Sequence, residues 1–90
     1  MGRRFRPSRH VLHQELEAEV VLLNLSSGIY YGAGAVGARI WKLVLEGKSP
    51  EEMVAQVVCE FDTSADQANA DVMAFLGDLE RRNLLECHDT

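Results

Sequence analysis

The feature that most constrains the fold is a pair of helix-start signals fifteen residues apart in the chain. Ser49 is followed by Pro50 and then by Glu52, which is the pattern of a capping box with proline at the first helical position. Ser64 is followed by Gln67 at the same spacing. Because each cap supplies an acceptor for otherwise unpaired backbone N–H groups, the chain predicts one short helix after the first signal and a second helix after the other.

Apolar residues recur at helical spacing in both segments, and also in residues 35–47, which predicts a third helix before them. Gly47 stands where that helix should end. Asn83 is predicted to end the last helix, and Leu84 and Leu85 are expected to fold back onto the core. The predicted buried stripes, helix by helix, are Val36, Ile40, Leu43 and Val44; Val54, Val57, Val58 and Phe61; and Val72, Phe75, Leu76 and Leu79.

The first third of the chain predicts three short antiparallel strands, over residues 10–16, 19–25 and 29–32. The turn at residues 17–18 lacks a strong hairpin dipeptide, whereas Ser-Ser-Gly at residues 26–28 suits a three-residue loop with a left-handed glycine. The order of elements predicts an α+β fold of the winged helix-turn-helix-like kind, with a three-stranded antiparallel sheet followed by three helices.

Charge divides the chain into two parts. The first nine residues contain four arginines, and residues 1–9 are predicted to be a flexible basic arm. Residues 10–90 are predicted to form one domain, which contains five basic and fourteen acidic residues and therefore carries a net charge of −9. Such a body repels a phosphate backbone.

No apolar run approaches the roughly 18 residues that span a membrane, and the basic start has no apolar stretch behind it that would make a signal peptide. Two cysteines are too few for a disulfide framework, which favours a reduced, cytoplasmic protein.

No group of residues points to catalysis or to a cofactor. His10 and His13 are three apart on a predicted strand and face opposite sides of the sheet. Cys87, His88 and Asp89 form a triplet near the C-terminus without a second ligand pair at zinc spacing. We therefore expect no metal, no cofactor and no enzymatic activity from this chain alone.

Helix-turn-helix domains commonly bind DNA through the second helix of the pair. Here that helix carries acidic residues along its exposed side and basic residues only at its C-terminal end. The composition therefore disfavours nucleic acid as a partner, although a winged-helix DNA-binding protein remains an alternative.

The third strand contains Ile29, Tyr30 and Tyr31 and no charged residue. Sheet edges are usually protected by lysine or proline, so an uncharged aromatic edge is suited to the addition of an extended peptide as a further strand. The alternative is that one tyrosine belongs to the core and the other is a solvated surface residue. A third possibility is that two copies pair through their edges.

The segments LLNL, SGIYYG, VGARIW, EGKSPEEMV and DVMAFLGDLERRNLL occur in an order and spacing that resemble the PqqD family. The resemblance extends from about Phe5 to Glu86, and it is greatest to the stand-alone members found in lasso-peptide biosynthesis. It implies a non-catalytic recognition element that binds the leader segment of a ribosomally made, later modified precursor peptide.

In this family the leader adds as a strand beside the third strand and lies in a groove against the third helix. The resemblance therefore implies a peptide-binding site made by Ile29, Tyr30, Tyr31, Val72, Met73, Leu76 and Glu80. A core role for Val72 and Leu76 is the alternative.

The implied partners are a precursor peptide and a separate enzyme, which is a leader peptidase in a lasso pathway or a radical SAM enzyme in a cofactor pathway. The chain is expected to be a monomer or a weak dimer.

Overall fold

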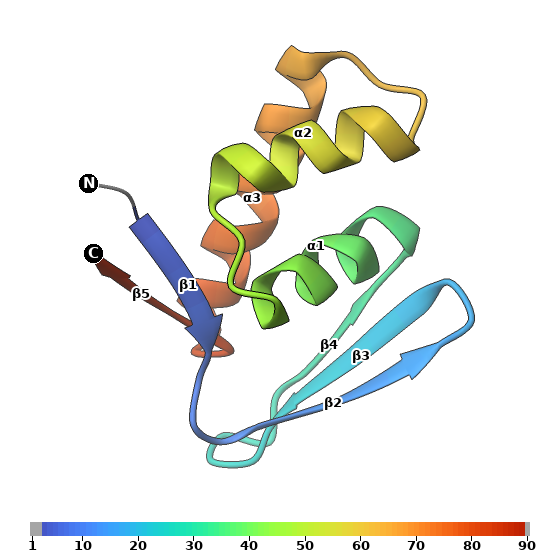
Figure 1. Cartoon of the computed structure of the whole chain (residues 1–90). Helices are drawn as coiled ribbons and strands as arrows, with labels where there is room; N and C mark the ends of the chain where they lie inside the picture. The colour runs from blue at the N-terminus through green and yellow to red at the C-terminus, as the bar shows by residue number, and fades with distance from the viewer. Residues whose placement is uncertain (1–2, 90) are drawn as a thin grey trace.

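The structure, a computed structural model, describes residues 3–89. Its helices and strands alternate little along the chain: four strands come first, three helices follow, and one strand ends the order (Figure 1). The elements are β1 (Arg3–Pro7), β2 (Val11–Leu16), β3 (Glu19–Asn24), β4 (Tyr30–Ala33), α1 (Ala35–Leu45), α2 (Pro50–Glu60), α3 (Ala65–Arg81) and β5 (Leu85–Asp89).

The predicted three-stranded antiparallel sheet is present, with strand order β2-β3-β4. In the loop before β4, the side-chain Oδ1 of Asn24 accepts hydrogen bonds from the backbone N–H groups of Ser26 and Ser27, at 2.9 and 3.2 Å. Gly28 follows with φ of +74°, which confirms the left-handed glycine of the predicted turn. The third strand begins one residue later than predicted.

All three predicted helices are present, and the capping residues predicted from the sequence lie at their ends. The capping box at α2 is complete, because the Ser49 hydroxyl accepts from the Glu52 N–H at 3.2 Å and the Glu52 carboxylate accepts from the Ser49 N–H at 2.8 Å. Ser64 caps α3, but the Gln67 side chain donates to Asp71 instead of returning to the cap. Gly47 and Asn83 have positive φ values of 78° and 57° just after α1 and α3.

The core lies where α1 packs on β3 and where α2 and α3 pack on each other. Leu84 and Leu85 fold back into this core, as predicted. The α2 stripe differs from the prediction by one position, because Met53 is fully buried whereas Val58 is exposed. The largest fully buried side chains are Trp41, Leu22, Ile40, Met53, Leu76, Leu79, Leu84, Val20, Val57 and Val72.

The prediction of a flexible basic arm over residues 1–9 is wrong for residues 3–7, which form β1 and pair antiparallel with β5. Phe5 is only 3% exposed and belongs to the core, while Arg4 donates to the carbonyl of Gly47 at 2.9 Å. The arginine-rich composition suggested a flexible arm. The strand could not be predicted from it, because its partner lies at the other end of the chain and local composition carries no information about such a pairing. The two strands lie side by side in Figure 1, next to both termini.

Candidate functional site

Strand β4 is an edge of its sheet, because it pairs with β3 and with no other described strand. The backbone N–H of Asn24 donates to the carbonyl of Ile29 at 2.9 Å, which identifies these two as a hydrogen-bonded pair. Since hydrogen-bonded and non-hydrogen-bonded pairs alternate in an antiparallel ladder, the backbone groups of Tyr30 and Gly32 point away from β3. These N–H and C=O groups can pair with an added strand.

Side chains of β4 alternate between the two faces of the sheet. Tyr31 and Ala33 lie on the face that packs on the helices, and both are partly buried against the core. Tyr30 lies on the opposite face and is 70% exposed, and Ile29 is exposed just before the strand. The two neighbouring tyrosines therefore have different surroundings, one beside the helices and one in solvent.

A groove of about 310 Å³ runs between the start of α1, strand β4 and one flank of α3. Its walls are mostly apolar, and their polar groups are the Tyr31 hydroxyl and two carboxylates on α3, which suits the apolar side chains of a bound segment with a few polar contacts. The lining residues are Tyr31, Val36, Gly37, Ile40, Asp71, Ala74, Phe75 and Asp78.

Tyr31 joins the edge strand to α3. Its hydroxyl donates to Oδ2 of Asp78 at 3.1 Å, and its ring meets Phe75 edge-on with 6.0 Å between centroids. The guanidinium of Arg82 lies 5.0 Å from the centre of the same ring, within range of a cation–π interaction. Burial and the hydrogen bond to Asp78 raise the pKa of the Tyr31 phenol above its usual value.

Asp78 carries its charge in a stabilising environment. The hydrogen bond from Tyr31, followed by the contacts with Arg81 and Arg82, holds the pKa of its carboxyl below the usual range. The two arginines lie 3.2 and 3.7 Å from Oδ1. Asp71, the other groove carboxylate, accepts a hydrogen bond from the Gln67 amide at 2.9 Å. One end of the groove therefore has an acid balanced by arginines, and the other has a carboxylate bonded to a neutral amide.

Gly37 allows α1 to approach both β4 and α3 at the base of the groove. A Cβ added there would lie 2.7 Å from Cβ of Ala33 and 3.0 Å from Cε1 of Phe75, and the first of these distances is too short for a carbon–carbon contact. The missing side chain therefore sets how closely the three elements of the groove meet.

The four α3 residues that were predicted to form the groove wall lie in different surroundings in the structure. Val72 and Leu76 are fully buried, which decides between the two alternatives in favour of a core role. Met73 is exposed, but at 100° per residue it lies about 160° around the helix axis from Phe75 and so projects from the other side of the buried stripe. Glu80 shares that side with Met73. In this conformation none of these four α3 residues lines the groove.

The residues that do line the α3 wall are Asp71, Ala74, Phe75 and Asp78. They could have been found from the sequence, because they recur at intervals of three and four residues along one flank of the predicted stripe. What the sequence did not indicate is which of the two flanks faces β4, and that depends on how α3 packs on α1 and α2.

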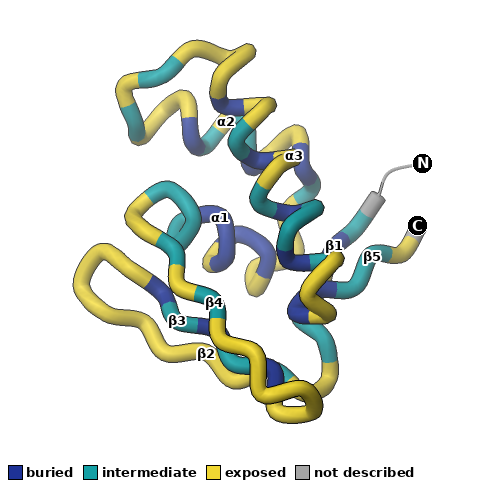
Figure 2. Tube along the Cα trace, turned by 180° about the vertical axis from the view of Figure 1, so that it is seen from behind, coloured by how far each residue is buried: buried dark blue, intermediate teal, exposed yellow. Residues whose placement is uncertain are grey.

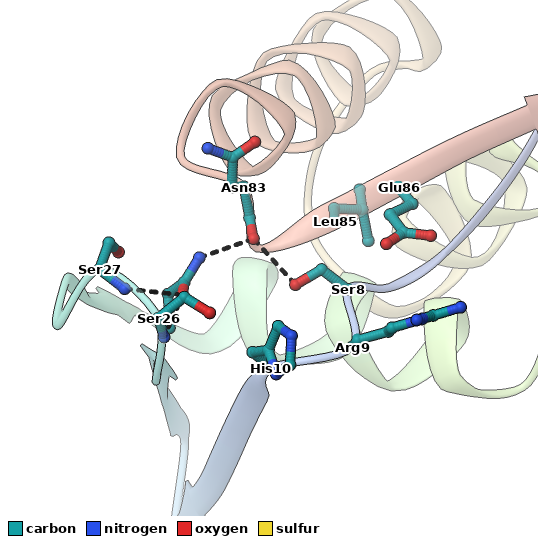
Figure 3. Close-up of a pocket in the computed structure, with 9 residues that line it drawn as sticks. Ser8, Arg9, His10, Ser26, Ser27, Asn83, Leu85 and Glu86 are labelled. Atoms are coloured by element: carbon teal, nitrogen blue, oxygen red, sulfur yellow. Dashed lines mark hydrogen bonds between the residues drawn. The ribbon is translucent and has the colours of Figure 1, made fainter.

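A second hollow, of about 380 Å³, lies where the β1–β2 connection meets the end of α3 (Figure 3). Here the backbone carbonyl of Asn83 accepts from the Ser8 hydroxyl at 2.8 Å and from the Asn24 amide at 2.9 Å. These bonds connect three segments that are distant in the chain. The polar groups of Ser8, Asn24 and Asn83 at this junction therefore bond to one another within the protein.

Within residues 3–89, no three His, Cys, Asp or Glu side chains are grouped closely enough to hold a metal ion. In the same part of the chain, the helices are all too short or too polar to cross a membrane.

A family model described as "Coenzyme PQQ synthesis protein D (PqqD)" matches residues 19–85, which is most of the chain. No curated protein sequence matches significantly.

Two solved structures are similar to this fold. One, titled "TbiB1 in Complex with the TbiA(beta) Leader Peptide", is 41% identical, with a TM-score of 0.85 and coverage of 90% of this chain and 94% of the other. The second, titled "Lasso peptide synthetase B1 complexed with the leader peptide", is 23% identical, with a TM-score of 0.84 and coverage of 91% and 96%. At that lower identity the second structure shows the shared fold alone.

Proposed function

The chain belongs to the PqqD family, and on that premise we propose that it binds the leader segment of a precursor peptide and is not itself an enzyme. The observation that carries the proposal is the free edge of β4 beside an apolar groove on α3. The solved relative that is 41% identical, which is described as a complex with a leader peptide, supports the same role.

In the proposed complex the leader forms an additional strand on β4. It pairs with the outward backbone groups of Tyr30 and Gly32, and its inward side chains enter the groove that Tyr31 and Phe75 line. Each backbone hydrogen bond contributes only about 0.5–1.5 kcal/mol net, whereas micromolar binding needs about 8 kcal/mol. Apolar anchoring in the groove must supply much of the difference, and the groove therefore determines which leaders bind.

We further propose that a separate enzyme acts on the bound peptide. Within the described residues, no group of three His, Cys, Asp or Glu side chains could hold a metal ion. The enzyme is a leader peptidase in a lasso pathway, or a radical SAM enzyme if the chain serves cofactor biosynthesis. The resemblance of the sequence to stand-alone members found in lasso-peptide biosynthesis favours the peptidase.

DNA binding is less well supported by the charges. The tip of the β2–β3 hairpin, which would be the wing, carries Glu17 and Glu19, and α3 has no basic residue before Arg81. Arg81 and Arg82 are both paired with Asp78. A steep salt dependence of binding to duplex DNA would be needed to favour that alternative.

The test is a fluorescence-anisotropy titration with the labelled leader of a precursor encoded beside this gene, and with a scrambled leader as control. We expect saturable binding near or below micromolar for the natural leader alone. Binding of both peptides, or of neither, would contradict the proposal.

Two neighbouring positions on α3 locate the site. Ala74 lines the groove and Met73 lies on the other side of the buried stripe, and both are exposed. We expect Ala74→Arg to fill the groove and to weaken leader binding at least tenfold, while Met73→Arg leaves the affinity within about twofold of wild type. If Met73→Arg weakened leader binding and Ala74→Arg did not, the leader would bind on the side of α3 that contains Met73 and Glu80.

A further inference from the structure

The sheet has a second face that the groove does not use. His13 contacts the Trp41 ring and Glu15 lies 3.7 Å from Lys42, so odd-numbered positions of β2 face α1. Leu12 and Leu16 therefore project from the opposite side. We call this side the outer sheet face; its apolar members are Leu12, Leu16, Val21, Leu23 and Tyr30.

The outer sheet face contains a continuous row of large apolar side chains across all three strands. Leu12 is the register partner of Leu23, which in turn is the partner of Tyr30. Leu12 is 56% exposed, and Leu23 is half-buried between its two neighbours. Single exposed leucines are common on protein surfaces, but a contiguous row on one face is typical of an interaction site.

No described helix or strand covers this face. The helices all lie on the other side of the β2-β3-β4 sheet (Figure 1), and β2 is exposed along nearly its whole length (Figure 2). A half-covered sheet usually carries polar residues on its solvent side, as β2 does only at Gln14.

The strands of this sheet and the tip of the β2–β3 hairpin contribute acidic charges only, and the nearest basic residues beside that tip are Arg39 and Lys42 of α1. Residues 11–38, which include the whole sheet, contain three glutamates and neither lysine nor arginine. Glu17 and Glu19 are exposed at the tip of the β2–β3 hairpin, next to Leu16. Two copies of this chain that met through this face would bring acidic hairpin tips close together, which costs energy, whereas a partner surface carrying lysine and arginine near the tip would be attracted.

The face is also continuous with the edge at which the leader is proposed to add. The backbone of Tyr30 belongs to that edge and its side chain belongs to the outer sheet face. A leader strand beside β4 would place alternate side chains on this same face. A protein docked here would contact the domain and the bound peptide together.

From these observations we propose that the outer sheet face is the docking surface for the enzyme that processes the bound precursor, through an apolar patch bordered by basic residues. This inference rests on the proposed leader-binding function. It adds the surface on which the enzyme is held and the chemistry of the enzyme's own contact surface.

The test measures two affinities for each variant: that for the labelled leader, and that for the purified peptidase or modifying enzyme encoded beside this gene, with the leader present. Leu12→Lys places a charge in the centre of the apolar row, and Leu16→Lys repeats the change nearer the acidic border. Leu45→Lys is the matched control, because Leu45 is a leucine of similar exposure, 43%, at the end of α1.

We expect Leu12→Lys and Leu16→Lys to weaken enzyme binding at least tenfold and to leave leader affinity within about twofold, and Leu45→Lys to change neither. Glu17→Lys combined with Glu19→Lys should slow enzyme association and reduce its salt dependence. Wild-type enzyme binding by both leucine variants would overturn the proposal.

Two other outcomes are also decisive. If wild type dimerises and Leu12→Lys is monomeric by light scattering, the occupant is a second copy and the proposal is wrong. If wild type binds no leader at all, the proposed function fails first. Loss of enzyme binding with normal leader binding is the result that supports the outer sheet face specifically.

Discussion

Gly37 shows how a single absent side chain shapes the groove. In a helix interior, Gly→Ala normally stabilises by about 0.5–1 kcal/mol. At Gly37 the added methyl would instead meet Ala33 at 2.7 Å, and we expect overpacking to destabilise the fold by about 1–3 kcal/mol. Urea unfolding of Gly37→Ala measures this.

Gly77 provides the matched control within α3. A Cβ there would lie 3.5 Å from Nη1 of Arg81, an ordinary contact with a flexible side chain. Gly77→Ala should therefore be stabilising, by about the usual helix-propensity difference. Equal effects of the two substitutions would show that helix propensity, and not the close approach at the groove, governs both sites.

Tyr31 offers a titration that reports on the groove. Burial and the Asp78 hydrogen bond raise its pKa in the folded state, so this group stabilises the fold fully below its unfolded pKa of about 10, and the contribution is lost as pH rises through the raised value. In Tyr30→Phe the tyrosinate absorbance reports Tyr31 alone. We expect Tyr31 to titrate at a higher pH than free tyrosine. The Asp78→Asn substitution should lower its pKa part of the way toward the value of free tyrosine.

At the scale of elements, β1 and β5 show that residues 3–7 and 85–89 belong to the folded domain. Phe5 pairs with Cys87 in the register and is buried in the core. We expect Phe5→Ala to lower the free energy of unfolding by about 3–5 kcal/mol, as for other buried aromatic residues.

The control for this element is Arg6→Ala, which removes an exposed 3.2 Å ion pair with Glu86. Exposed pairs contribute about 0–1 kcal/mol, so the loss should be small. If Phe5→Ala were as mild as Arg6→Ala, residues 3–7 would behave as the flexible arm that the composition suggests.

The helices were predictable as elements because their signals are local. A cap side chain bonds a backbone N–H three residues away, and an apolar stripe repeats every three or four residues, so both can be read in a short window. The prediction buried Val58 and not Met53 because it placed the buried side of α2 at the wrong rotation about the helix axis. A stripe indicates that one side is buried, but the neighbouring helix decides where its centre lies.

At the scale of the whole molecule, several carboxylates make the free energy of unfolding depend on pH in the acidic range. Backbone and side-chain hydrogen bonds at Ser49 lower the pKa of Glu52, the bond from Gln56 and the contacts with Arg39 lower that of Glu60, and the bond from Tyr31 lowers that of Asp78. A lowered folded pKa stabilises above the unfolded value and loses that contribution as pH falls through the folded one.

We therefore expect the free energy of unfolding in urea to fall between about pH 5 and pH 2. The unfolded chain binds more protons than the folded one over this range. Replacing Asp78 by Asn should make the decline shallower, whereas an unchanged slope would show that Asp78 is not held in its charged form.

The predictions from the sequence agree best with the structure in the order of the helices and strands, and they agree least in the residues of the binding site. Ile29, Tyr30 and Tyr31 lie at a free sheet edge, but the α3 residues named with them are either in the core or on the other flank. The groove needs the relative placement of β4, α1 and α3, and each of these packs through contacts between residues far apart in the chain.

The sequence by itself determined the helix starts, the turn glycine and the acidic charge of the body, because each depends on interactions between neighbours or on composition alone. Only the tertiary structure decided that residues 3–7 pair with residues 85–89, that Phe75 and not Met73 faces β4, and that Leu12, Leu23 and Tyr30 form one uncovered row. Strand register and helix rotation are settled by burial across the whole domain, and no local pattern contains that information.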